Sequence, residues 1–395
     1  MVQRENNQMR IKPPERKKRK KVNYYDYNLL AVLILLTCFG LIMIYSTSAY
    51  SAQLMFDDRT FFFNKQMQIS AVCLIAVLIG SQINYRIYIK FTPYIYILTV
   101  ILLILTRFVG KTVNGATRWI EITNSIQIQP AEVAKVAIIM FLPFVILKKG
   151  RKLKELKSSV TVLGLGLFLA YLTLEFTSNL STAIIIAGIT VVILYIAHPK
   201  TWPFILAFVV GIIGVLLFVS VAKQNLDFFK NSDNYQLNRI YAWLNLEGSS
   251  SAEGYQIIQG LYAVGSGGFF GKGLGNSSQK MGAVPEAQND MIFSIICEEL
   301  GVFGAFLIIV LFIYLLYRLL YIAQNAPDLY GSLMVTGIFA HIAIQVVLNI
   351  AVVLGVIPPT GITLPFISYG GTSVVFLMAE MTLALSVSKQ IKYDS

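Results

Sequence analysis

The sequence predicts an all-α polytopic membrane protein with about ten transmembrane helices and a long extracytoplasmic loop between the seventh and the eighth. Hydrophobic residues make up 56% of the 395 residues, and the mean hydropathy is +0.67. Apolar residues recur in blocks of about 18–22, the length that a helix needs to cross a bilayer. The short segments of alternating polarity that build a membrane β-barrel do not occur, which favours helices.

Each apolar block predicts one helix, bounded by polar or Pro- and Gly-containing segments. The expected spans are about 28–48, 67–83, 91–108, 131–147, 159–176, 181–197, 203–222, 291–315, 332–354 and 371–388. Three units follow from them. They are a basic tail (1–26), a membrane domain (27–390) with its long outer loop at 223–290, and a short C-terminal tail (391–395).

The positive charge indicates a membrane orientation and argues against a nucleic-acid partner. Of the net charge of +12, nine Lys and Arg residues fall in 1–21 and six in 147–157. Basic segments beside spans stay on the cytoplasmic side and can contact anionic lipid. Both termini, the segment 147–157 and a turn around Arg318 are therefore expected in the cytoplasm. Outside lie 49–66, 109–130, 223–290 and 355–370, in a multi-pass protein of a cytoplasmic membrane.

Cysteine and histidine do not predict a metal or disulfide framework. Cys38, Cys73 and Cys297 lie in or beside apolar blocks, and no Cys-x-x-Cys occurs. His198 and His341 are far apart in sequence. Structural zinc sites use closely spaced pairs of these residues, so none is expected.

The outer segment 109–130 and the start of the fourth span carry the first candidate residues. Trp119 suits an aromatic belt at the membrane interface. Arg118 is a candidate for phosphate binding or for a surface salt bridge. Glu132 and Lys135 share a helix face. Because ions in a span must be paired or face a cavity, they are expected either to bridge each other or to place a cation near a substrate's pyrophosphate.

The long outer loop contains the glycine-rich run GSGGFFGKGLG at residues 265–275. It lacks the Walker pattern and follows no predicted strand, which argues against nucleotide binding. Glycines in such a run allow close backbone packing or approach to a lipid-linked ligand. Lys272 is either a phosphate partner or a solvated side chain.

The segment PEAQNDMIFSIICEELG (285–301) places carboxylates at the entrance of the eighth span. Asp290, at the outer rim, could act as a general base toward a sugar hydroxyl, or could cap the helix, where aspartate is favoured. Glu298 and Glu299 lie two to three turns deeper and are expected to pair structurally or to tune the site. The Pro- and Gly-rich segment 355–370 predicts a rigid, non-helical outer connection, which is tolerated at membrane depth where it is buried or lines a cavity.

Four separated segments together resemble the SEDS family (shape, elongation, division and sporulation), whose members include FtsW, RodA and SpoVE. They read NGATRWI…QPAEVAK, GYQIIQGLYAVGSGGFFGKGLG, PEAQNDMIFSIICEELG and GITLPFISYGGTS, and the resemblance runs from about 26 to 388. The family's essential aspartate corresponds to Asp290, its N-G-A-x-R-W arginine to Arg118, and its P-S-E-x-x-K pair to Glu132 and Lys135.

The resemblance implies a ten-span peptidoglycan glycosyltransferase. Such an enzyme polymerises lipid II, the undecaprenyl-pyrophosphate-linked disaccharide pentapeptide, at the outer membrane face, with a class B penicillin-binding protein and other divisome or elongasome proteins as partners. The division or sporulation branch fits better than RodA. Two departures stand out. Gln288 and Asn289 precede Asp290 where relatives often have His and Thr, and Asn179 replaces a charged residue of the family pattern.

The implied reaction is an inverting glycosyl transfer with Asp290 as the base. Charge on the departing pyrophosphate would be stabilised by Arg118, Lys135 or Lys272, or by a divalent cation such as Mg²⁺ or Mn²⁺. Two alternatives stay open, a lipid II flippase and a non-catalytic scaffold for a transpeptidase. A transporter should cluster its ionisable residues near the membrane midplane, whereas those of this sequence gather at the outer rim.

Overall fold

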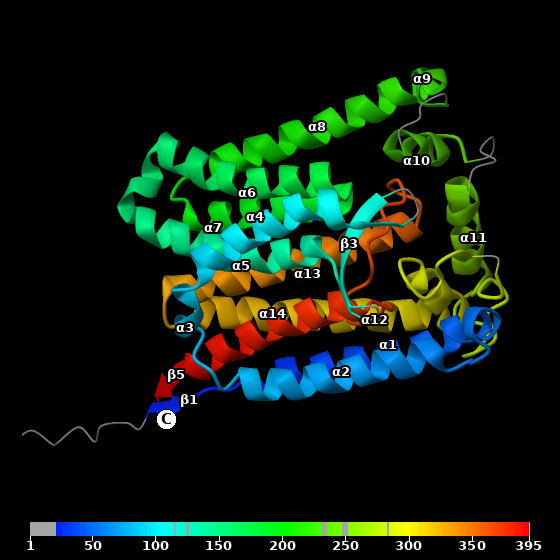
Figure 1. Ribbon diagram of the computed structural model, residues 1–395, viewed down its shortest axis with the longest axis horizontal. Coiled ribbons are helices and arrows are strands. Elements are labelled where there is room, and N and C mark those ends of the chain that lie inside the picture. Colours follow the sequence, from blue (N-terminus) through cyan, green and yellow to red (C-terminus); the bar gives the residue numbers. More distant parts are fainter. Residues whose placement is uncertain are drawn as a thin grey trace, which may run out of the picture.

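Ten helices that are long and apolar enough to cross a membrane dominate the computed structural model, which describes residues 21–113, 116–123, 126–230, 235–246, 252–282 and 284–394. Most of the predicted tail, residues 1–20, lies outside the described residues. The predicted fold class and number of spans are confirmed (Figure 1). The ten are α1 (Tyr27–Phe56), α2 (Phe61–Gly80), α4 (Thr92–Val109), α5 (Pro130–Lys149), α6 (Leu156–Thr177), α7 (Leu180–Ala197), α8 (Trp202–Gln224), α12 (Ile292–Asn325), α13 (Leu329–Val353) and α14 (Gly371–Gln390).

The eighth span is longer than predicted. α12 runs to Asn325, so Arg318 lies inside the helix and the prediction of a turn around it was wrong. Arg318 remains in the helix because its guanidinium is neutralised: Nη2 lies 2.7 Å from Oδ2 of Asp26, and the Tyr321 ring lies beneath it. A buried cation with such a partner no longer has to mark the end of a span.

Short elements fill two of the predicted outer segments. The connection from α8 to α12 contains three short helices, α9 (Leu226–Lys230), α10 (Tyr235–Leu244) and α11 (Ala252–Ser266). The segment 109–130 forms an antiparallel sheet of β2 (Lys111–Val113), β3 (Ala116–Thr123) and β4 (Ile126–Ile128), which the sequence analysis did not predict. β3 reads ATRWIEIT, rich in the β-branched and aromatic residues that favour strands.

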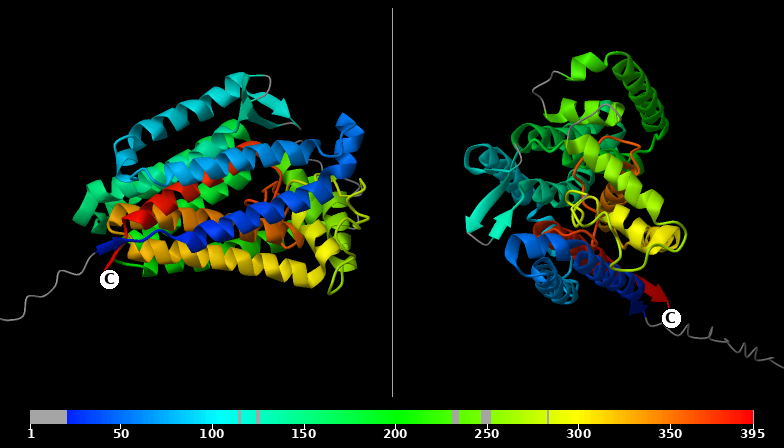
Figure 2. Two further views of the ribbon diagram at one scale, coloured as in Figure 1. Left: turned by 90° about the horizontal axis from the view of Figure 1, so that it is seen from below. Right: turned by 90° about the vertical axis from the view of Figure 1, so that its right-hand side faces the viewer.

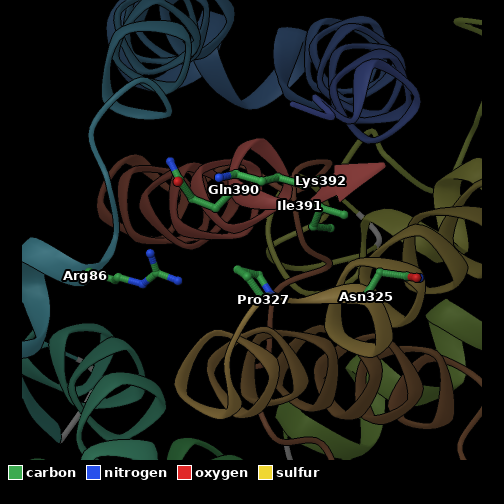
Figure 3. A pocket seen from close by; sticks show the side chains of 6 residues that line it. All are labelled: Arg86, Asn325, Pro327, Gln390, Ile391 and Lys392. Carbon is green, nitrogen blue, oxygen red and sulfur yellow. The ribbon is translucent and has the colours of Figure 1, made fainter. Parts of the chain in front are cut away.

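The two chain ends meet at one end of the bundle. β1 (Lys21–Asn23) pairs antiparallel with β5 (Lys392–Asp394), and the short α3 (Arg86–Ile89) lies at the same end of the bundle (Figure 1). The 3₁₀ helix η1 (Gly150–Lys154) connects α5 with α6. A pocket of about 350 Å³ opens at the end of the bundle with the two strands, lined by Arg86, Lys392 and four neighbours (Figure 3). It touches Asn325 at the end of α12, so the 34-residue helix separates it from Met291 by roughly 50 Å. The pocket therefore belongs to the end remote from Asp290.

Helix α8 lies at the edge of the bundle, as the right-hand view of Figure 2 shows. Among its residues only Ala222 is buried, although the helix is apolar throughout. A helix with apolar residues on every face and few protein neighbours requires an apolar solvent, which the lipid of a bilayer supplies. The structure is that of a multi-pass membrane protein.

Helix α12 is interrupted at Gly301, where the backbone has φ 68° and ψ −166°. The break lets the loop from Gly267 to Gly273 approach the helix backbone, and Lys272 N donates to Glu298 O at 2.9 Å. A methyl group built on Gly301 would lie 2.4 Å from both Gly271 N and Phe269 O. Only glycine satisfies both the dihedral angles and the close approach.

Replacing Gly301 by alanine is therefore expected to destabilise the protein by about 1–3 kcal/mol or more, since it adds backbone strain to a steric clash. Thermal unfolding of the detergent-solubilised protein measures the effect. Gly164→Ala is the matched control, because Gly164 lies in α6 with no atom within 4 Å of an added methyl group. Equal melting temperatures for the two variants would contradict the assigned role of Gly301.

Candidate functional site

Asp290 lies at the mouth of the bundle, two residues before α12 begins. The residue is half-buried, and its Oδ1 atom is enclosed without a hydrogen-bond partner among the described residues. Met291 is the N-cap residue and no side chain caps the helix, so Asp290 is not a helix cap, although its charge still lies beside the N-terminus of α12. The Oδ1 atom, left without a structural bond at the rim, is available to a ligand.

Burial, followed by the negative charge of Glu286, raises the pKa of Asp290 to about 6. Arg239 and neighbouring backbone N–H groups act in the opposite direction, because they favour the charged form. A pKa just below neutrality suits a general base, which must be deprotonated yet basic enough to accept a proton.

Arg239 is a site residue that the sequence analysis missed. It lies on α10, and its Nη1 donates to Pro359 O at 3.2 Å. A methyl group built on Gly361 would lie 3.9 Å from Asp290 Oδ2 and 4.0 Å from Arg239 Nη1, so the carboxylate and the guanidinium face the same point. The available signal was that Arg239 is the single arginine of the predicted outer loop, 223–290.

The non-helical segment from Gly355 to Gly370 forms the surface against which these two charges lie. It connects α13 with α14, as predicted. Side chains of other elements donate to its carbonyl groups, which replaces the hydrogen bonds that a helix would supply. These bonds are Trp243 Nε1 to Gly355 O (2.8 Å), Arg239 Nη1 to Pro359 O (3.2 Å), Ser181 Oγ to Thr360 O (2.7 Å), Asn349 Nδ2 to Ile362 O (2.7 Å) and Gln345 Nε2 to Thr363 O (3.0 Å).

Asn349 joins this segment directly to the rim of α12. Its Nδ2 donates both to Ile362 O, at 2.7 Å, and to Asp290 O, at 2.8 Å. Tyr369 N also donates to Gln288 O at 2.9 Å. The main chain around Asp290 is therefore fixed to the segment that faces its side chain, and the sequence analysis did not single out Asn349.

Glu132 and Lys135 form the predicted mutual salt bridge, with Lys135 Nζ 2.9 Å from Glu132 Oε1 and both side chains buried. Lys135 Nζ also donates to Gln345 Oε1 at 3.2 Å. On α13 and α14, His341 Nδ1 lies 2.8 Å from Glu380 Oε2, and His341 Nε2 lies 2.7 Å from Gln345 Oε1. The bundle thus contains a continuous buried polar chain that reaches the Gly355–Gly370 segment through Gln345.

Glu298 and Glu299 pair structurally, as expected, and anchor the glycine-rich loop. Glu298 lies 2.6 Å from Lys272 Nζ and accepts a short bond from Ser277. Glu299 lies 2.7 Å from Lys280 Nζ and accepts from Ser46 Oγ at 2.7 Å. Lys272 is exposed to solvent, as one of the two interpretations expected, and its ammonium group is paired with Glu298.

Arg118 and Trp119 lie on β3, and both are half-buried. Arg118 Nη2 donates to Ser178 O at 3.4 Å, next to the N-terminus of α7. In the same strand pairing, Trp119 lies opposite Lys111. The sheet places a guanidinium over the entrance to α7, whose Ser181 holds the Gly355–Gly370 segment.

Comparisons with known proteins find similarity over nearly the whole chain. A family model for FtsW, RodA and SpoVE, described as "Cell cycle protein", matches residues 26–393. Stage V sporulation protein E of Bacillus subtilis is 38% identical over 371 residues, which covers 93% of this chain and 98% of that protein. The probable peptidoglycan glycosyltransferase FtsW of Trichlorobacter lovleyi is 35% identical over 376 residues, covering 93% and 94%.

Two solved structures share the fold. One is a chain of a peptidoglycan synthase complex studied for the coordination of polymerization and crosslinking. It has a TM-score of 0.74 at 25% identity, with 92% of this chain and 97% of that chain covered. The other is the rod shape-determining protein RodA of Thermus thermophilus, with a TM-score of 0.66 at 22% identity and coverages of 92% and 96%.

Proposed function

Because this chain belongs to the FtsW, RodA and SpoVE family and is a peptidoglycan glycosyltransferase, we propose that it polymerises lipid II with Asp290 as its general base. The observation that carries the assignment is the enclosed Asp290 carboxylate, which has one oxygen without a structural partner and the other facing the same glycine as Arg239. The resemblance of the rim sequence to the family's essential segment supports the same residue.

The proposed orientation follows the positive-inside rule. The end of the bundle with β1, β5 and the basic 147–157 segment faces the cytoplasm, and Asp290 faces the outer side of the cytoplasmic membrane. A lipid-linked substrate can then reach the rim laterally with its isoprenoid chain still in the bilayer.

In the proposed reaction Asp290 accepts the proton of an acceptor sugar's 4-hydroxyl group. The oxygen forms a bond to the anomeric carbon of the donor from the face opposite the leaving group, and the bond to undecaprenyl pyrophosphate breaks with inversion. The proton ends on Asp290, and the electron pair of the broken bond leaves with the pyrophosphate. Fixing the Asp290 main chain through Asn349 keeps the base in place for this transfer.

Negative charge on the departing pyrophosphate requires a cation nearby. Arg239 is the proposed first choice, because it faces the same glycine as Asp290, and Arg118 at the mouth of α7 is the second. Lys135 and Lys272 are weaker candidates, because Glu132 and Glu298 already neutralise them. We assign Glu132 to holding Lys135, and Trp119 to the membrane interface.

A class B penicillin-binding protein is the proposed partner, and division or sporulation the proposed setting. The FtsW and sporulation relatives support the setting, and the neighbouring structure of a peptidoglycan synthase complex supports the partner. In such a pair the partner's transpeptidase would crosslink the strand that this chain polymerises.

Transport of lipid II is a second candidate, favoured by one observation. Glu132, Lys135, His341 and Glu380 are buried among the spans, whereas the sequence indicated ionisable residues at the rim. Their pairing with one another and with Gln345 favours a structural role over a substrate path.

We further propose that a divalent cation binds at the rim. Asp290 Oδ1, Asn349 Oδ1 and Thr360 Oγ1 are enclosed oxygens without hydrogen-bond partners among the described residues. Hard oxygen donors suit Mg²⁺ or Mn²⁺, and Mg²⁺ is commonly held by one carboxylate together with substrate phosphates. The cation would supply positive charge to the pyrophosphate.

Removing divalent cations with a chelator is expected to lower lipid II polymerisation about tenfold or more, because pyrophosphate loses a counter-charge, and Mg²⁺ or Mn²⁺ should restore it. Mn²⁺ binding followed by electron paramagnetic resonance gives a readout independent of turnover. Asp290→Asn should weaken that binding, while the exposed Glu286→Gln should largely retain it. Unchanged Mn²⁺ affinity in Asp290→Asn would overturn the proposed ligand.

Asp290→Asn is expected to lower polymerisation by about 10²–10⁴-fold, the contribution of a positioned base, while the protein stays folded. Glycan products from lipid II and transbilayer movement of lipid II are measured in the same proteoliposomes, with the partner protein present. Normal polymerisation by the variant would refute the assignment. Translocation abolished together with polymerisation would favour transport.

The pH dependence of kcat/KM should report the same carboxylate. Burial raises the pKa of Asp290 to about 6 without a bound cation, and a divalent cation at Oδ1 would lower that pKa, so the base form predominates above pH 6 in either case. We expect kcat/KM to be level above about pH 7 and to fall about tenfold per pH unit well below 6. Arg239→Gln should move the midpoint upward, since it removes a charge that favours the carboxylate. A profile of the wild type with no acidic limb would contradict the role of Asp290.

A further inference from the structure

Five buried side chains form one continuous polar chain through α5, α13 and α14. Glu132 Oε1 lies 2.9 Å from Lys135 Nζ, which lies 3.2 Å from Gln345 Oε1. The same Gln345 oxygen lies 2.7 Å from His341 Nε2, and His341 Nδ1 lies 2.8 Å from Glu380 Oε2. All five are buried inside the span region, where an uncompensated charge is costly.

The partners of Gln345 fix the orientation of its amide. Its Nε2 faces Thr363 O at 3.0 Å, and a carbonyl can only accept a hydrogen bond. Its Oε1 faces the ammonium group of Lys135, which can only donate. The two contacts agree, so the amide nitrogen points to the Gly355–Gly370 segment and the oxygen points into the polar chain.

The orientation of Gln345 determines the protonation of His341. The Nε2 atom of His341 faces an amide oxygen and its Nδ1 atom faces the carboxyl group of Glu380, so both ring nitrogens donate when that group is ionised. The ring is then an imidazolium, with charge +1. Together with Lys135, Glu132 and Glu380 it gives a neutral set of two ion pairs joined by one uncharged amide. Such a set satisfies the bilayer's demand for compensated charge.

The amide held in this way acts on the site through the main chain. Thr363, which accepts from Gln345 Nε2, lies two residues after Gly361, and Gly361 faces both Asp290 Oδ2 and Arg239 Nη1. One helical turn beyond Gln345, Asn349 donates to Ile362 O and to Asp290 O. Residues 345 and 349 on one face of α13 therefore set the two sides of the candidate site relative to each other.

We propose that Gln345 is a positioning residue for Asp290, and that the ion pairs Glu132–Lys135 and His341–Glu380 exist to hold its amide in that orientation. The proposal rests on the proposed function of Asp290. Gln345 does not touch the substrate in this scheme. It keeps the Gly361 backbone at the distance from Asp290 and Arg239 that the reaction requires. A small displacement of that backbone lowers kcat more than it weakens substrate binding.

Gln345→Glu tests this separately from stability. The glutamate keeps an oxygen for Lys135 and His341 but replaces the N–H donor with an oxygen that repels Thr363 O. We expect kcat for lipid II polymerisation to fall about tenfold to a hundredfold and KM to change less than about threefold. The added buried charge should also lower the melting temperature, so both constants are measured well below it, where the variant and the wild type are folded. Thr336→Val on the same helix is the matched control, because Thr336 Oγ1 bonds only within α13, to Ser332 O.

The ion pair between His341 and Glu380 is tested by removing its charges, first singly and then together. His341→Gln or Glu380→Gln alone leaves one buried charge without its partner and should lower kcat, whereas the double variant restores a neutral pair and should recover much of the loss. Nitrogen NMR of labelled His341 in the wild type should show the imidazolium signature.

Each outcome decides a different point. Gln345→Glu with the kcat of Thr336→Val, or with a loss confined to KM or to folding, would overturn the positioning role. A neutral His341 ring would overturn the proposed arrangement of charges. Asp290→Asn in the same assay separates the two proposals: if it retains full activity, the proposed function of Asp290 fails. If it is inactive while Gln345→Glu is normal, only the positioning role fails.

Discussion

The structure depends on the requirement that every backbone polar group at membrane depth find a partner inside the protein. Eight of the ten spans meet it with uninterrupted helices, whereas α5 contains Pro143 in its interior and α12 is broken at Gly301. Between α13 and α14 the backbone is not helical, and side chains of α7, α10 and α13 supply the missing donors. An irregular segment held in this way has few alternative conformations, because moving it would leave several buried polar groups without hydrogen-bond partners at once. That rigidity makes it a suitable wall for a catalytic carboxylate.

The same requirement for buried partners separates the carboxylates near the start of α12 into two groups. Glu298 and Glu299 lie in the helix and are fully buried, so each has a lysine and a serine hydroxyl as partners. Those partners come from the loop 272–280 and from α1, which makes the two glutamates anchors for the outer surface. Asp290 lies just outside the helix, where one oxygen is left without a partner among the described residues. The position of a carboxylate relative to the helix start thus separates structural pairing from chemistry.

Much of the fold could be predicted from the sequence, which also offered a candidate for the central residue of the site. Span length and hydropathy identify ten helices because the bilayer imposes a fixed thickness, and the Glu132–Lys135 bridge follows from helical spacing. Family resemblance, rather than spacing, singled out Asp290. Arg239 and Asn349 were missed because their contacts join distant parts of the chain: Asn349 bonds Asp290 across 59 positions and Arg239 bonds Pro359 across 120. No local period encodes such a contact, and the β2–β4 sheet depends likewise on a pairing register.

Helix α13 shows why the contacts that the sequence does not predict are concentrated at the candidate site. A sequence of mean hydropathy 2.0 identifies it as a span, yet His341, Gln345 and Asn349 recur on it at intervals of four residues and form one polar stripe. On a lipid-facing helix such a stripe would be costly, so its presence requires protein on that side. α5 and α14 supply charged partners for its inner part, and the Gly355–Gly370 segment supplies carbonyls for its outer part. The stripe therefore connects the charged interior of the bundle, by direct hydrogen bonds along one helix, to the rim where Asp290 lies.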